Sequence, residues 1–135
     1  MIKRYVLFVV LLICFAFYGC KSKEQGNAMI EGKWYFSELP GAYIEFNGNT
    51  CTEHNGDGTG VTYSIKWVDD THYDLTVTQA DGLAALVFKP GDVMNVEVKE
   101  LTKDYYRYYV TGKGSPQCIF VVRKKEYEGP VGTPC

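Results

Sequence analysis

The chain has 135 residues, of which 46% are apolar and 22% are charged, as expected for one folded domain. Its 14 Lys and Arg are outnumbered by 16 Asp and Glu, which gives a net charge of -2. Nucleic-acid binding depends on clustered basic residues, so this balance argues against a nucleic-acid partner.

The N-terminus has the pattern of a signal peptide over residues 1–19. Lys3 and Arg4 carry positive charge, the run 5–18 contains no charged residue, and a small residue precedes Cys20. The apolar run is shorter than the roughly 20 residues of a membrane-spanning helix, which disfavours the alternative of an uncleaved membrane anchor. Cleavage would remove Lys3 and Arg4 but none of the 16 acidic residues, leaving a net charge near -4.

The residues Tyr18-Gly19-Cys20 resemble the cleavage site of bacterial lipoproteins, in which the cysteine is acylated, for example with palmitate, and becomes the first residue. The commonest form of that site has Leu where this chain has Phe17. The resemblance implies a lipid anchor on Cys20, and each buried methylene of its acyl chains contributes about 0.8 kcal/mol to membrane binding. Lys21 resembles the outer-membrane address of enteric lipoproteins. We therefore expect a protein anchored at the outer membrane in the envelope of a Gram-negative bacterium. The sequence does not decide between the periplasmic and the surface face of that membrane.

Composition divides the mature chain into three parts. Residues 20–29 comprise the lipidated cysteine and a short polar tether. Residues 30–127 form the predicted domain, and residues 128–135, with two Gly and two Pro, form a surface tail.

Within the domain, apolar and polar residues alternate with period two, as in half-buried antiparallel strands. Turn pairs such as Pro40-Gly41 and Asn47-Gly48 separate the runs. The pattern predicts an all-β fold, a small antiparallel up-and-down β-barrel of about eight or nine strands, in which closure removes exposed strand edges. A β-sandwich fits the same spacing and is the alternative. The predicted strands are 30–36, 42–47, 49–54, 61–67, 73–78, 83–89, 94–99, 105–111 and 118–125.

The motif Gly32-Lys33-Trp34 resembles the lipocalin G-x-W at the start of the first strand. Arg123 lies in the last strand, where lipocalins commonly place an arginine over that tryptophan, a contact of about 0.5–2 kcal/mol. The second lipocalin motif, T-D-Y, has only a partial counterpart in Asp104-Tyr105-Tyr106. The domain is shorter than a full lipocalin and lacks its C-terminal helix, so it is more similar to the compact lipocalin-like domains of Gram-negative lipoproteins. The resemblance implies structural roles for Gly32, Trp34 and Arg123.

The interior of such a barrel holds either a packed core or one small ligand. The first hypothesis is a lipocalin-like barrel that binds a small hydrophobic molecule. The alternative is a closed barrel that acts through its outer surface on an envelope protein, as an interaction module or an inhibitor. A cavity above about 300 Å³ favours the first, and a filled interior with an exposed Tyr and Arg patch favours the second. The candidate lining residues are Phe36, Ile44, Phe46, Tyr63, Ile65, Trp67, Leu75, Val77, Met94, Val96, Tyr106 and Tyr108.

Tyr105-Tyr106-Arg107-Tyr108-Tyr109 is the most distinctive run in the domain. Alternation sends Tyr106 and Tyr108 to one face and Tyr105, Arg107 and Tyr109 to the other. One set belongs to the core and the other could form an exposed patch for a protein or sugar, and the pattern does not decide which set faces outward.

Three of the five cysteines remain once Cys14 leaves with the signal and Cys20 carries lipid. An oxidising compartment permits one disulfide among them, and we expect Cys135 to pair with either Cys51 or Cys118. The alternative is that all three are free and act as small apolar residues.

Residues suited to catalysis or metal binding are few. His54 and His72 are the only histidines, and a zinc site needs three or four converging ligands, so no metal site is expected. The loop 55–59 alternates oxygens as calcium loops do, but it lacks a bidentate acid at a suitable distance. Asp69 and Asp70 are adjacent and fit a turn better than an acid pair. With no nucleophile motif and no cofactor motif, an enzyme is not expected.

Overall fold

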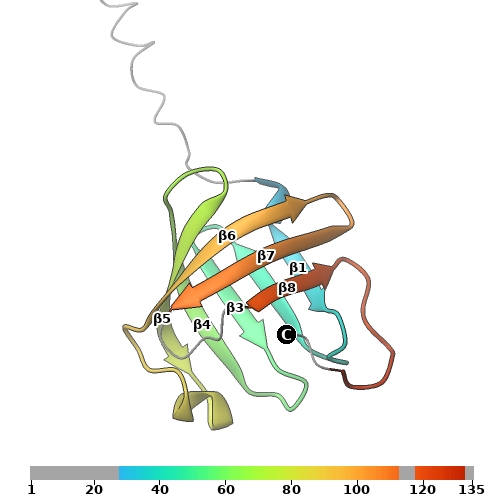
Figure 1. Ribbon diagram of the computed structural model, residues 1–135. Coiled ribbons are helices and arrows are strands. Elements are labelled where there is room, and N and C mark those ends of the chain that lie inside the picture. The colour runs from blue at the N-terminus through green and yellow to red at the C-terminus, as the bar shows by residue number, and fades with distance from the viewer. Residues whose placement is uncertain (1–27, 113–117, 133–135) are drawn as a thin grey trace, which may run out of the picture.

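The computed structural model describes residues 28–112 and 118–132. The signal peptide, Cys20, most of the tether and Cys135 lie outside these residues. The described chain forms a closed barrel in which each strand pairs with the next in sequence and β8 pairs with β1 (Figure 1). All pairs are antiparallel, which confirms the up-and-down barrel and excludes the sandwich. The strands are β1 (Gly32–Phe36), β2 (Tyr43–Asn47), β3 (Thr50–His54), β4 (Gly60–Trp67), β5 (His72–Ala80), β6 (Val93–Leu101), β7 (Tyr105–Gly112) and β8 (Cys118–Arg123).

The barrel interior is filled by large aromatic side chains from several strands. Trp34, Phe46, Tyr63, Tyr73 and Tyr106 are each at most 2% exposed. The Trp34 and Tyr106 rings meet edge to face with centroids 6.0 Å apart, and Phe46 meets Tyr73 in the same way at 6.2 Å. Such pairs add about 0.5–1.5 kcal/mol beyond the area they bury. The predicted inward alternation of these strands is therefore confirmed.

The seam between β1 and β8 is the shortest pairing in the barrel. It contains two register pairs, Tyr35 with Arg123 and Phe36 with Val122, whereas β1 and β2 share four. One further backbone bond, from Ser37 N–H to the Val121 carbonyl at 3.2 Å, extends it.

The G-x-W corner is closed by a lysine rather than by the predicted arginine. Lys124 Nζ lies 3.9 Å from the Trp34 ring centroid and donates to the Glu31 carbonyl at 3.2 Å. Arg123 instead faces outward, with its guanidinium 5.7 Å from the Tyr105 ring centroid. The prediction for Arg123 was wrong because successive residues of a strand point to opposite faces, and the residue past the end of β8 is the one that reaches the indole.

Gly32 is required at this corner for two reasons. Its φ is +100°, a conformation that side-chain-bearing residues rarely adopt, and a Cβ there would stand 3.3 Å from Lys124 Nζ. On the other side, Trp34 Nε1 donates to the Ile30 carbonyl at 2.8 Å, which ties the strand to the short 3-10 helix η1 (Ala28–Ile30). Gly32 and Trp34 thus both take part in this corner of the barrel.

The predicted strand over 83–89 is wrong, and the segment contains the 3-10 helix η2 (Gly82–Leu86). An apolar run by itself does not distinguish a strand from a short helix. Because β5 pairs directly with β6, no place remains for a strand between them. η2 lies at the end of the barrel opposite to the start of the described chain (Figure 1). In the described part of the chain, no helix is both long and apolar enough to cross a bilayer.

Candidate functional site

The interior retains a small space that is lined by inward-facing side chains of the strands and by Phe88, which follows η2. The cavity has a volume of about 100 Å³. Liquid water occupies about 30 Å³ per molecule, so this space corresponds to about three waters. Six of the predicted lining residues border it, namely Phe36, Ile44, Tyr63, Leu75, Met94 and Tyr108.

The other six predicted lining residues do not border this cavity. Phe46, Ile65, Val77, Val96 and Tyr106 are buried in the core instead. Trp67 is only partly buried and packs on Tyr73, with ring centroids 4.7 Å apart. Half of the predicted lining residues therefore pack in the barrel without bordering the cavity.

Glu53 borders the interior cavity and was not among the predicted residues. It lies two positions after the buried Cys51 in β3, so alternation turns both side chains inward. The Tyr63 hydroxyl donates to the Glu53 carboxylate at 3.4 Å, and burial raises the pKa of Glu53. The same period of two within residues 50–54 was the signal that could have identified it.

The two cysteines of the described barrel differ in state. Cys51 is buried with a free thiol, and burial raises its pKa well above the usual range. Cys118 is disulfide-bonded, and its partner lies outside the described residues. The predicted pairing of Cys135 with Cys51 is therefore wrong. The alternative pairing of Cys135 with Cys118 stays a prediction.

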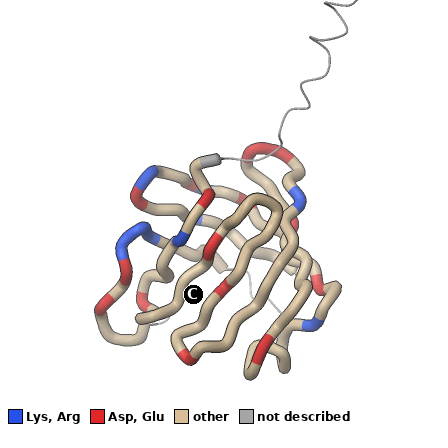
Figure 2. The backbone as a smooth tube through the Cα atoms, turned by 180° about the vertical axis from the view of Figure 1, so that it is seen from behind, with Lys and Arg blue, Asp and Glu red and all other residues tan. Residues whose placement is uncertain are grey.

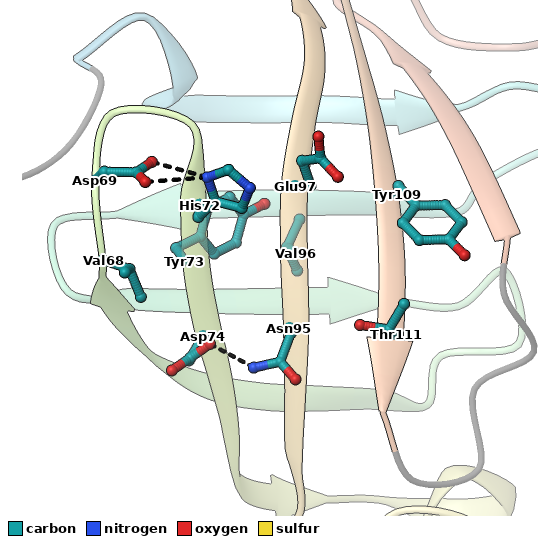
Figure 3. Close-up of a pocket in the computed structure, with 10 residues that line it drawn as sticks. All are labelled: Val68, Asp69, His72, Tyr73, Asp74, Asn95, Val96, Glu97, Tyr109 and Thr111. Carbon is teal, nitrogen blue, oxygen red and sulfur yellow. Dashed lines mark hydrogen bonds and ion pairs between the residues drawn. The ribbon is translucent and has the colours of Figure 1, made fainter.

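A wide groove crosses the outside of β5, β6 and β7 and has a volume of about 550 Å³. Its floor consists of outward-facing side chains of the three strands, among them Asp74, Asn95 and Tyr109 (Figure 3). Asn95 Nδ2 donates to Asp74 Oδ1 at 2.6 Å, which holds these two side chains across neighbouring strands.

The β4–β5 turn forms one wall of this groove. Asp69 accepts a hydrogen bond from the Thr71 backbone N–H at 2.8 Å. It also accepts one from His72 Nδ1 at 2.9 Å (Figure 3). The backbone bond from Thr71, followed by the bond from His72, lowers the pKa of Asp69 to about 2. The predicted turn role of Asp69 is confirmed, whereas its pairing with His72 was not anticipated.

The open question about the tyrosine-rich run is settled by β7. Tyr106 and Tyr108 are buried, and Tyr105, Arg107 and Tyr109 face outward. Tyr105 donates its hydroxyl proton to the Glu100 carboxylate, which also lies 3.5 Å from Arg107. We call the outward surface of β5, β6 and β7, including the groove, the β5–β7 outer face.

Neither histidine belongs to a metal centre in the described chain. His54 faces outward and stacks on Tyr43 with ring centroids 4.4 Å apart. Lys33 Nζ covers the Tyr43 ring at 4.1 Å. Within residues 28–112 and 118–132, no three side chains of His, Cys, Asp or Glu are grouped so that they could hold a metal ion.

The loop that resembles a calcium site closes on itself. Asp57 Oδ1 accepts hydrogen bonds from the Thr59 hydroxyl at 2.6 Å and from the Thr59 N–H at 2.9 Å. These bonds lower the pKa of Asp57, which is fully exposed. The loop is thus a hydrogen-bonded turn, as its glycines predicted.

Charged residues of both signs gather mainly in the turns and the barrel ends (Figure 2). On the outer surface, polar and aromatic side chains contact one another on the β5–β7 outer face and in the stack of Lys33, Tyr43 and His54. Comparison of the chain with family models, with curated proteins and with solved structures found no match.

Proposed function

We propose that this chain is a lipid-anchored protein of the bacterial envelope whose closed barrel acts through its outer surface, by binding a partner protein with the β5–β7 outer face. The observation that carries the proposal is the filled interior. A cavity of about 100 Å³ is well below the roughly 300 Å³ at which ligand pockets begin.

The composition of the β5–β7 outer face supports this role. Tyr and Arg are enriched among the residues that dominate protein–protein binding energies, and β7 presents Tyr105, Arg107 and Tyr109 on one face. The adjoining groove of about 550 Å³ can receive a protruding side chain of a partner. Its acidic side chains Asp69, Asp74 and Glu97 favour a partner that presents Lys or Arg there.

Anchoring through Cys20 is the second part of the proposal and is supported by the sequence pattern at residues 1–20. The test is fractionation of cells that express the full chain or its C20S variant. We expect the wild-type chain in the membrane fraction with an added acyl mass, and the variant in the soluble fraction without it. Equal membrane association of both would contradict the anchor.

The outer-face role is tested by site-specific photocrosslinking in intact cells. A crosslinker replaces Tyr109 in one variant and Lys66, an exposed residue outside the groove, in the control variant. We expect a discrete crosslinked protein from position 109 that is lost on adding R107A. Identical products from both positions would refute a specific face.

A small hydrophobic ligand remains the second candidate, because the interior cavity is lined mostly by apolar and aromatic residues. Its size restricts the ligand to a few non-hydrogen atoms. Native mass spectrometry of residues 21–135 tests it. A reproducible small-molecule adduct that is lost on unfolding would favour the interior over the outer face as the binding site.

A further inference from the structure

A second groove lies where the C-terminal tail passes the β1–β8 seam, on a different part of the surface from the β5–β7 outer face. Its volume is about 370 Å³. The end of β1 and the residue after it contribute Tyr35 and Ser37, the end of β8 contributes Arg123, and the tail contributes Lys125 and Tyr127. We call it the tail groove.

Ser37 lines this groove and carries an unsatisfied hydroxyl. Its Oγ is buried and has no partner, and it is the one side-chain atom of the described residues in that condition. Its backbone is held in place by the N–H bond to the Val121 carbonyl at 3.2 Å. A buried hydroxyl without a partner is unfavourable and marks a place where a missing acceptor belongs.

The residue next to it is held in a strained conformation. Glu38 has a φ of +72°, and it is the single residue other than glycine with a positive φ in the described chain. The Gly132 N–H donates to the Glu38 carbonyl at 2.8 Å, so the tail fixes this conformation. Tyr127 also donates its hydroxyl proton to the Pro130 carbonyl at 2.8 Å, which shapes the tail itself. Backbone strain of this kind is concentrated at binding sites.

Within the part of the chain that the structure describes, the charged side chains of the tail groove make no ion pairs. Among the described residues, no carboxylate lies within ion-pair distance of Arg123 or Lys125, and no cation lies within that distance of Glu126 or Glu128, which also line the groove. The lining therefore offers two cations, two carboxylates and two tyrosine rings. This combination complements a ligand that carries both charges.

We propose that the tail groove binds a small zwitterion of the amino-acid or short-peptide type. The ligand carboxylate lies at Arg123, whose planar guanidinium matches carboxylate geometry, and accepts the hydrogen bond of Ser37. The ligand ammonium group lies at Glu126 or Glu128, and the organic body packs on Tyr35 or Tyr127. A volume of about 370 Å³ is within the usual range for small-molecule sites.

The experiment is an NMR titration of ¹⁵N-labelled residues 21–135, which include the whole closed barrel. The probes are L-phenylalanine, the dipeptide Gly-Phe, phenylalaninamide without the carboxylate, and N-acetylphenylalanine without the ammonium group. We expect saturable shifts centred on the Ser37 and Arg123 amides with L-phenylalanine or Gly-Phe, and at least about fivefold weaker binding of both blocked derivatives, as loss of one charged contact implies. A preference for Gly-Phe over L-phenylalanine would indicate a peptide terminus rather than a free amino acid.

Matched variants separate the site from general effects. R123Q is expected to weaken binding about tenfold and S37A about threefold, whereas K66Q and S64A, which alter exposed residues away from the groove, should leave it unchanged. A dispersed amide spectrum of each of the four variants shows that its barrel is still folded. Absence of saturable shifts with either zwitterion, equal binding of phenylalaninamide, or equal effects of R123Q and K66Q would overturn the proposal.

Discussion

Replacement of Lys124 by Met tests whether this lysine closes the G-x-W corner. The substitution keeps an unbranched side chain of similar length but removes the ammonium group 3.9 Å from the Trp34 ring centroid. A cation over an indole at a partly exposed site contributes about 0.5–1 kcal/mol. The lost hydrogen bond to the Glu31 carbonyl adds about 0.5–1 kcal/mol. We therefore expect K124M to lower the free energy of unfolding by about 1–2 kcal/mol.

The assay is urea unfolding of residues 21–135, followed by tryptophan fluorescence and circular dichroism. For a domain of this size a loss of about 1 kcal/mol lowers Tm by about 4 °C or more. The control is R123M, which removes a guanidinium 5.7 Å from the Tyr105 ring on the outside of the barrel. It should change the free energy of unfolding by less than about 0.5 kcal/mol. If R123M costs as much as K124M, the assignment of Lys124 to the corner is refuted.

Three further predictions concern the interior and η2. Because burial raises the pKa of Glu53 above its ordinary value of 4.5, deprotonation costs more in the folded state, so stability should fall as pH rises from 4.5 through the raised pKa. Urea unfolding across this range should show that E53Q lacks this decline, and parallel pH profiles would contradict it. Y73F leaves the buried Tyr106 hydroxyl without its partner at 2.7 Å and should cost about 1–3 kcal/mol, whereas Y73F/Y106F should cost less than the two single variants together, which a double-mutant cycle measures. L86S should change the midpoint of thermal unfolding little, because Leu86 is 78% exposed, whereas L75A should cost about 2–5 kcal/mol; a large effect of L86S would mean that η2 is packed.

Most of the strands were predictable because one face of each is buried. Strict alternation in residues such as Tyr73, Leu75 and Val77 reports directly which side chains point inward. Pro-Gly and Asn-Gly pairs located the turns, since few other residues accept the backbone angles of tight hairpins. Where the run was continuously apolar, as at residues 83–89, the same reasoning failed.

The candidate binding surfaces were less predictable because they combine residues distant in sequence. The tail groove joins Ser37 to Arg123 and Tyr127, and the β5–β7 outer face joins Asp69 and Asp74 to Tyr109. Period two places each residue on a face, but it does not say which neighbouring strand supplies the opposite wall. The interior role of Glu53 was missed for a different reason, because a charged residue in a polar run was not expected to follow its buried neighbour inward.

The sequence by itself determined the all-β class and the positions of most hairpins, because each depends on local alternation or turn chemistry. Only the tertiary structure decided that Lys124 rather than Arg123 covers Trp34, that Tyr106 and Tyr108 rather than Tyr105 and Tyr109 fill the core, and that the interior is nearly full. Those outcomes depend on the register at which the barrel closes and on the sum of side-chain volumes inside it, and both are properties of strands brought together from the whole chain.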